Sequence, residues 1–342
     1  MAGEMIENPF DSTGFDLATM TEAINLLPNR YGRYQQSGLF TVEPVSTRVI
    51  EVDELDGTLN ILPALPVGAP PTESKHDKAK SRFFKIPHIP HKDTIKAEDI
   101  QNARRPGGYD LETLSNLIMV REARMRMNHA ITLEHLMAGA LRGIIYDYDG
   151  TTVLYNLYTE FGITQKVLNF VFTTATTAIP TVLRNVKRHI EDNLRGDVMD
   201  KVYCDASEEW MDAFLEHPTV KEVFLGHQAA LKKAGIGGDA RQDFEFEGII
   251  FNEYRAKAPG KNGTLKRFIP ADEAIFYPGG TTETFKVHNA PANRLDTVNT
   301  PGLPLYAWQT MEPNQRWIDL FSEANPLTIC RRPGTLVKAT KS

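Results

Sequence analysis

The sequence has few cysteines and no long apolar run. Only Cys204 and Cys330 occur among the 342 residues. Charged residues interrupt every possible run of about 18 apolar residues, so we expect no membrane-spanning helix. Because residues 1–20 contain no cleavable apolar signal, we expect a reducing cytosol as the environment and two free, buried thiols.

The chain also lacks a surplus of positive charge. Its formal net charge is -6, which argues against a protein that mainly wraps nucleic acid, because phosphate neutralisation requires cations. The hydrophobic content of 41% is ample for the core of one large domain or two.

Familiar catalytic and metal motifs are missing. The sequence contains no phosphate-binding loop, dinucleotide glycine motif, nucleophile elbow or HExxH zinc motif, which excludes only the familiar enzyme types. His88 and His91 have a spacing that some metal sites use, but Pro87 and Pro90 force an extended chain and no cysteine lies nearby. We therefore expect no metal site.

Two further patterns have a plain and a functional interpretation. Asp147 and Asp149 resemble the start of a calcium loop, but no glutamate closes it, and a hairpin turn at Asp149-Gly150 is favoured. Cys204 could pair with His189 or His217 as a nucleophile, although a buried structural cysteine is favoured. The neighbouring aromatic residues fit a helix-borne core stripe better than a cofactor pocket: Trp210, Phe214 and Phe224.

One long helical pattern covers residues 110–145, with Asp110 as its N-cap. A helix of roughly thirty residues is about 45 Å long at a rise of about 1.5 Å per residue. Gly139 and Gly143 each weaken its last turns by about 1 kcal/mol relative to alanine, which predicts fraying or a bend there. The apolar stripe is Leu111, Leu114, Leu117, Ile118, Met125, Ile131, Leu136 and Leu141. The face expected to meet solvent or a neighbouring molecule carries Arg121, Glu122, Arg124, Arg126, Asn128 and Glu134.

The N-terminal hundred residues look unable to form a core of their own. Residues 1–46 form an irregular arm with a short helical candidate at 17–27, and the runs 47–67 and 83–95 predict the two strands of a long hairpin. Because an isolated hairpin is marginal in water, it should lie against another surface, which can belong to another subunit. The tract at 75–85 carries five cations, and either a solvated loop or a docking site for an acidic neighbour explains it.

The remaining chain predicts an α+β fold with segregated helices and antiparallel strands. A second hairpin is expected at 146–162. Helices are expected at 179–195, 207–216 and 219–233, with Ser207 as an N-cap. Strands are expected at 244–251, 265–269, 274–277, 305–308 and 336–339.

Several sequence blocks, in a specific order, closely resemble the E-type major capsid protein of lambda-like tailed bacteriophages. The blocks in the last hundred residues are Phe268-Ile269-Pro270, Phe276-Tyr277-Pro278-Gly279-Gly280, 299–307 and 323–333. Earlier blocks that agree are Tyr31-Gly32-Arg33, Val202-Tyr203-Cys204, 210–213, 217–221 and 248–255. The resemblance runs over nearly the whole chain.

This resemblance implies the Hong Kong 97 fold. Its parts would be an N-terminal arm at 1–46, an extended loop at 47–97, a peripheral domain at 98–174 with a spine helix at 110–145, an axial domain at 175–298, a return through the peripheral domain at 299–325 and a C-terminal strand at 326–342 on the axial side. It also implies a virion shell of hexamers and pentamers, assembled in the host cytoplasm around a scaffold and enclosing double-stranded DNA.

The implied partners are other copies of the chain, a scaffolding protein, a portal protein and, as an optional partner, a decoration protein. No catalytic residue, cofactor or metal is implied. The candidates for inter-subunit contact are Lys75, Lys78, Lys80, Arg82, Lys85, Tyr31 and Arg33. Two rival classes are an enzyme that uses Cys204 and a tail-tube or other ring protein. A tail tube is built mainly from a β-sandwich, so the long helix disfavours it.

Overall fold

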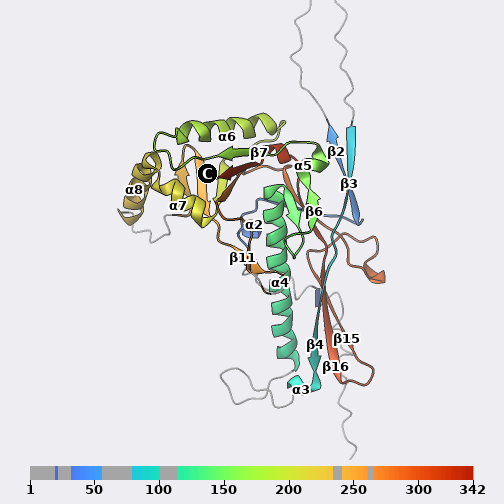
Figure 1. The fold of residues 1–342 in the computed structure, drawn as a ribbon. Coiled ribbons are helices and arrows are strands. Elements are labelled where there is room, and N and C mark those ends of the chain that lie inside the picture. Colours follow the sequence, from blue (N-terminus) through green and yellow to red (C-terminus); the bar gives the residue numbers. More distant parts are fainter. Residues whose placement is uncertain are drawn as a thin grey trace, which may run out of the picture.

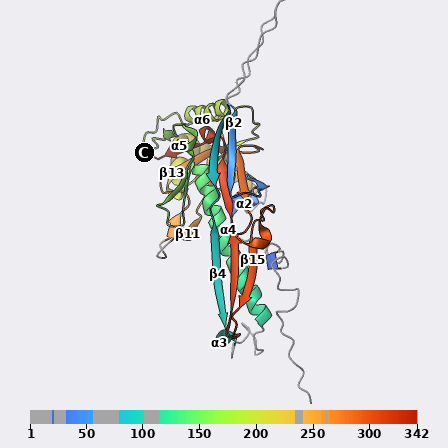
Figure 2. The ribbon, with the colours of Figure 1, turned by 90° about the vertical axis from the view of Figure 1, so that its right-hand side faces the viewer.

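The computed structural model describes residues 20–21, 32–55, 79–100, 114–233, 241–260, 263 and 265–341. A long helix, α4, runs lengthwise through the molecule (Figure 1). A sheet covered by helices lies beside one end of it, and a three-stranded sheet runs along its other half in both views (Figures 1 and 2). No helix in the described ranges is long and apolar enough to span a bilayer.

Helix α4 spans Leu114–Arg142, 29 residues without a break, which confirms the predicted continuous helix. Residues 110–113, including the expected N-cap, lie outside the described residues. The predicted end at residue 145 is wrong, because Ile144–Tyr146 forms strand β5. Gly143 ends the helix with a φ of 76°, a conformation that favours glycine.

The two glycines at this end allow close packing. A Cβ on Gly139 would lie 3.0 Å from the Cα of Ile145, so the glycine lets β5 approach the helix closely. At Gly143 a Cβ would collide with the ring of Tyr158. The end of α4 is therefore a tight turn back along the helix.

The predicted polar face of α4 is wrong at two of its carboxylates. Glu122 is 7% exposed and Glu134 is 0% exposed. The burial of Glu134 is compensated by hydrogen bonds that its carboxylate accepts from neighbouring elements, as described below. Glu122 lies on the buried stripe with Ile118 and Met125, and burial raises its pKa to about 7.

The largest sheet has six strands in the order β7-β18-β13-β8-β10-β9. In that order they are Lys166–Asn169, Val337–Thr340, Glu273–Pro278, Val202–Ala206, Ile249–Glu253 and Phe244–Phe246. The pairs β10/β8 and β18/β7 are parallel, which corrects the expectation of antiparallel strands. The helices between β8 and β10 supply the long crossover that a parallel pair requires.

The three helices beside this sheet confirm the predicted helical segments to within about two residues. They are α6 at Ile179–Asn193, α7 at Glu208–Glu216 and α8 at Pro218–Lys233. The Ser207 hydroxyl caps α7 and accepts from the Trp210 backbone N–H at 3.4 Å. Trp210 and Phe214 are fully buried against the sheet, as the core interpretation predicted.

Two smaller sheets pack along α4. The first contains β15 (Tyr306–Met311), β16 (Trp317–Ala324) and β4 (Ile89–Lys96), and Ile95 and Leu320 pack with the helix residues Ile118 and Met125. The second contains β1 (Thr41–Pro44), β14 (Phe285–Asn289) and β17 (Pro326–Cys330), with β1 parallel to β14.

Part of the long predicted hairpin is described. Strands β2 (Val49–Leu55) and β3 (Ala79–Lys85) pair with each other, and residues 56–78, which include the rest of the predicted strand 47–67, lie outside the described residues. The run 83–95 is not one strand, because it breaks at residues 86–88, where Pro87 lies, and continues as β4 on β16. Both described strands of the hairpin thus lie on their own subunit.

Two other hairpins complete the fold. Strands β5 and β6 (Val153–Asn156) form the second hairpin, but the predicted range 146–162 is too long at its end, because Leu157–Phe161 forms helix α5. In its turn the Gly150 N–H donates to the Asp147 carbonyl at 2.8 Å and the Asp149 carboxylate accepts from Thr151 N–H at 2.8 Å. The turn interpretation of this acidic pair is thus confirmed. Strands β11 (Lys257–Pro259) and β12 (Leu265–Arg267) form the last hairpin. The short helices are α2 at Arg33–Gln36, α3 at Ala97–Ile100, α5 at Leu157–Phe161, η3 at Leu295–Thr297 and η4 at Pro333–Thr335.

We predict that Gly143→Ala lowers the free energy of unfolding by about 2 kcal/mol or more, because alanine must adopt a positive φ and collide with Tyr158. Gly226→Ala is the matched control. Gly226 lies within α8 with nothing near its Cβ position, so alanine there should raise stability by up to about 1 kcal/mol. Urea denaturation of the unassembled subunit measures both, and equal effects would contradict the packing argument.

We also predict that Glu122→Gln removes a pH dependence. A carboxyl whose folded pKa is raised from 4.5 to about 7 stabilises the fold fully below pH 4.5 and loses that contribution as pH rises to about 7. The variant should match the natural chain near pH 4.5 and be more stable by up to about 3 kcal/mol at pH 8. A constant difference across this range, measured by urea denaturation, would contradict the assignment.

Candidate assembly site: the joints of the N-terminal segment

The N-terminal segment (32–55 and 79–96) is attached to the rest of the described chain by three polar joints. The first joint holds α2 against α4. The Tyr34 backbone N–H donates to Glu134 Oε1 at 3.0 Å, and the Tyr254 hydroxyl donates to the same oxygen at 2.7 Å. The Gln35 amide donates to the Ala130 carbonyl at 2.6 Å. These contacts fix the position of α2 on α4.

The same joint contains a second buried carboxylate, Asp205 on β8. It lies 3.0 Å from the Arg33 guanidinium and accepts from the Tyr277 hydroxyl at 2.7 Å. Asp205 is 0% exposed, and burial raises its pKa even though Arg33 opposes that shift. Arg33, predicted to contact another subunit, thus makes an ion pair inside its own subunit.

Gly32 is required by this joint. Its φ is 109°, and a Cβ there would lie 2.5 Å from the Glu134 carboxylate. Only glycine fits both the backbone conformation and the close approach. This gives a physical reason for the glycine within the block 31–33 that resembles the capsid family.

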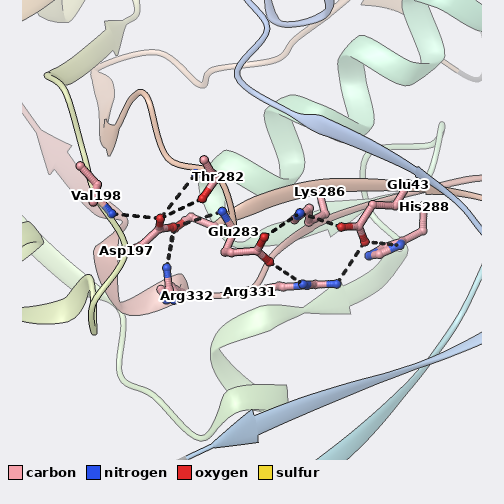
Figure 3. Close-up of polar contacts among 10 residues, drawn as sticks. Glu43, Asp197, Val198, Thr282, Glu283, Lys286, His288, Arg331 and Arg332 are labelled. Carbon is pink, nitrogen blue, oxygen red and sulfur yellow. Dashed lines mark hydrogen bonds and ion pairs between the residues drawn. The ribbon is translucent and has the colours of Figure 1, made fainter. Parts of the chain in front are cut away.

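The second joint attaches β1 to β14 through a network of charges (Figure 3). Glu43 on β1 contacts Lys286 Nζ at 2.6 Å and Arg331 at 3.3 Å. Glu283 contacts the same two cations, at 3.3 Å and 3.1 Å. Lys286 is 3% exposed, so the two acids compensate for burying its charge.

Electrostatics at this joint favour a charged Glu43 beside a neutral histidine. Burial alone would raise the pKa of Glu43, but Lys286 and Arg331 outweigh it and lower that pKa. Burial lowers the pKa of His288 to about 4, although its Nδ1 lies 3.4 Å from Glu43. His288 therefore contributes no charge at neutral pH.

An adjoining cluster ties the loop after α6 to the start of β14. Asp197 pairs with Arg332 and accepts from the Thr284 hydroxyl at 2.8 Å and the Val198 N–H at 3.0 Å (Figure 3). Burial opposes ionisation of Asp197, but these donors lower its pKa. The helix-covered sheet and the β1 sheet are thereby connected.

The third joint lies at the base of the β2–β3 hairpin. Glu323 on β16 is 3% exposed and accepts from Asn293 N–H at 2.8 Å and the Asn325 amide at 2.8 Å. Arg48, just before β2, and His88, just after β3, contact the same carboxylate at 3.4 Å and 3.1 Å. Both ends of the hairpin are thus fixed to one acidic side chain.

The histidine pair does not converge. His88 contacts Glu323, whereas His91 Nε2 lies 3.3 Å from the Asn128 amide and its ring is 6.1 Å from that of His129. Within the described ranges, no group of three or more His, Cys, Asp or Glu has the arrangement of a metal site.

Of the predicted contact residues, Tyr31, Lys75 and Lys78 lie outside the described residues, as does the side chain of Lys80. Arg82 lies against its own subunit, donating to the Glu160 carbonyl at 2.6 Å with its guanidinium 4.7 Å from the Phe161 ring centroid. The side chain of Lys85 is exposed, while its backbone N–H and carbonyl bond the Tyr155 hydroxyl at 2.9 Å and 2.6 Å.

Both cysteines are free and fully buried, as predicted. Burial raises the pKa of Cys330 to about 12 and raises that of Cys204 well above its ordinary value. His217 Nε2 lies 3.4 Å from the Thr174 carbonyl oxygen, and His189 is half-buried on α6. A protonated thiol in an apolar core is a poor nucleophile.

The sequence analysis missed the acids that organise the joints: Glu43, Asp205, Glu283 and Glu323. A usable signal existed for Asp205, because a lone acid within the apolar run 202–206 must find a donor if the strand is buried. For Glu43 and Glu323, the cations lie more than 200 residues away in sequence and could not be recognised. Glu283 lies three residues before Lys286, but this spacing predicts a contact only within a helix.

The model of the phage major capsid protein E family matches residues 16–341. The chain belongs to this family. It is 32% identical over 343 residues to the major capsid protein of Pseudomonas phage KPP10, covering 96% of this chain and 98% of that one. The protein is therefore a structural capsid protein of a tailed phage, and a component of the virion.

Solved capsid structures share the fold at low sequence identity. The chain in the mature capsid of bacteriophage PhiM1 matches with a TM-score of 0.55 and 11% identity, over 91% of this chain and 87% of that one. The chain in the capsid of Ralstonia phage GP4 matches with a TM-score of 0.53 and 11% identity, over 99% and 97%. The α+β fold is thus of the Hong Kong 97 type.

We predict that Arg33→Met lowers the free energy of unfolding by about 3 kcal/mol, because Asp205 then remains buried without its cation. Lys201→Met is the control, since Lys201 and Glu245 are 43% and 54% exposed and their pair should contribute less than about 1 kcal/mol. Urea denaturation compares the two. Equal small losses would show that Asp205 needs no cation.

Proposed function

We propose that many copies of the chain assemble as hexamers and pentamers into an icosahedral shell that encloses double-stranded DNA. The observation that supports this most directly is the two-sided β2–β3 hairpin. Ile50 and Phe84 are buried on their own subunit, whereas Val49 and Phe83 are 49% and 67% exposed on the other face. Glu51 and Lys85 lie on the same exposed face. A face that combines large apolar and charged side chains, and that the described part of its own subunit leaves exposed, suits contact with a neighbour.

We assign the parts of the chain accordingly. The arm is 1–46, the extended loop 47–97, the peripheral domain 98–174, the axial domain 175–298, the return 299–325 and the C-terminal strand 326–342. Helix α4 would be the spine of the peripheral domain, and the sheet flanked by α6, α7 and α8 the axial domain.

Such a subunit works through contact area. A thin shell requires each copy to bury surface against several neighbours, and an arm and a long loop add contact area without thickening the wall. Each contact can stay weak enough to break during assembly, while the sum over neighbours stabilises the closed shell. The contact residues that we propose are Tyr31, Lys75, Lys78, Lys80 and Lys85. Arg33 and Arg82, which contact their own subunit, would position the arm and the loop.

A scaffolding protein, a portal protein and, as an optional partner, a decoration protein would complete assembly, which would take place in the host cytoplasm. DNA would be enclosed without specific binding, consistent with the net charge of -6. No residue would perform catalysis, because the function rests on contacts and both thiols are buried.

We predict that replacing residues 56–78 by Asn-Gly leaves a folded subunit that cannot build shells. Leu55 pairs with Ala79, so a two-residue turn can close the hairpin at that point without disturbing β2 and β3. Negative-stain microscopy after expression with the scaffold should show no shells, while circular dichroism should show a fold like that of the natural chain.

Two further outcomes complete this test. Lys187→Glu with Lys221→Glu, on α6 and α8, is a control that should still form shells. If the shortened hairpin also forms normal shells, the proposed role of the extended loop is wrong.

A further inference from the structure

The half of α4 nearer its start has a second apolar face. Its buried stripe, which includes Ile118, Glu122 and Met125, faces the β15–β16–β4 sheet. With about 3.6 residues per turn, Val120 and Met127 lie on the opposite side of the helix. They are 64% and 50% exposed, and Met119 beside them is 53% exposed.

These residues align along one side of the helix. Val120, Ala123 and Met127 follow the spacing i, i+3, i+7, which is the spacing of a helix-packing stripe. Among the described elements, the sheet lies along one side of this half of α4 and no other element covers the opposite side (Figures 1 and 2). Scattered apolar residues need no explanation, but an aligned set indicates a contact surface.

Within the described part of α4, the exposed charge beside this surface is positive. Between residues 114 and 128 the only charged side chains are Arg121, Glu122, Arg124 and Arg126. Glu122 is buried on the opposite face, and Arg124 is exposed beside Val120 and Met127. Arg121 pairs with Asp93 at 3.3 Å and Arg126 is half-buried, so the exposed Arg124 carries most of the charge on this side of α4. The complementary partner surface is therefore apolar with acidic flanks.

We propose that Met119, Val120, Ala123 and Met127, flanked by Arg124, dock an acidic amphipathic helix of another protein. This inference rests on the proposed function, in which a scaffolding protein takes part in assembly. The surface spans about two turns, and methionine adapts its shape to a packed helix. An apolar centre contributes nothing to binding phosphates, which argues against nucleic acid as the occupant.

The test uses the unassembled full chain and a designed, fluorescein-labelled amphipathic helical peptide with glutamate flanks. Fluorescence anisotropy should show binding, and a peptide with lysine flanks should bind at least about tenfold more weakly. Val120→Glu with Met127→Glu should weaken binding of the acidic peptide by at least about tenfold. Arg124→Glu should weaken the acidic peptide and strengthen the lysine peptide.

The matched control is Val223→Glu with Leu225→Glu on α8, where the side chains are 45% and 54% exposed. It should bind the acidic peptide like the natural chain. Equal affinity for both peptides, or equal loss in this control, would overturn the proposal. Duplex DNA that binds through the same four α4 residues would overturn it in favour of nucleic acid.

A loss of self-association in the α4 variant, measured by sedimentation without peptide, would overturn it in favour of contact between copies. Binding is measured on unassembled subunits. The peptide-binding result can therefore be interpreted whatever the hairpin test shows about shell formation. A failure of peptide binding does not contradict the proposed shell function.

Discussion

Buried carboxylates determine where the N-terminal segment lies on the rest of the subunit. Moving a carboxylate out of water costs several kcal/mol unless charged or hydrogen-bonding partners compensate. Asp205 and Glu134 are 0% exposed and Glu323 is 3% exposed, and each takes donors from the N-terminal segment. The larger part of the chain thus positions buried carboxylates whose hydrogen-bond donors and cations come from residues 33–48 and 88.

This arrangement suits a protein whose arm and loop must point in fixed directions. Apolar packing alone tolerates small shifts in register, whereas a buried carboxylate requires its donors at one position and penalises their loss. Because Arg48 and His88 share Glu323, the two ends of the hairpin are fixed at one point. The hairpin can then extend from its base without a core of its own.

Local signals predicted the local structure well. The spine helix, the Ser207 cap and the Asp149-Gly150 turn depend on residues within a few positions of one another, and all three are present. Strand β1 was missed because its pairing with β14 joins segments more than 200 residues apart, as in Thr41 with Lys286. Every residue of β14 and of β17 is buried, so neither strand shows the alternation by which strands are recognised. For the joints, the sequence indicated Gly32 and Arg33 but not their partners.

The one systematic error, on the faces of α4, has a physical explanation. Assigning charged residues to solvent and apolar residues to the core placed Glu122 outside, while the structure buries Glu122 and His129 and exposes Val120 and Met127. For an isolated subunit this exchange is unfavourable, because burial raises the pKa of Glu122 and lowers that of His129 to about 4. A partner that covers Val120 and Met127 would recover apolar burial at about 25 cal/mol per Å². The helix is therefore better understood as an element with two apolar faces, of which the described part of its own subunit covers one.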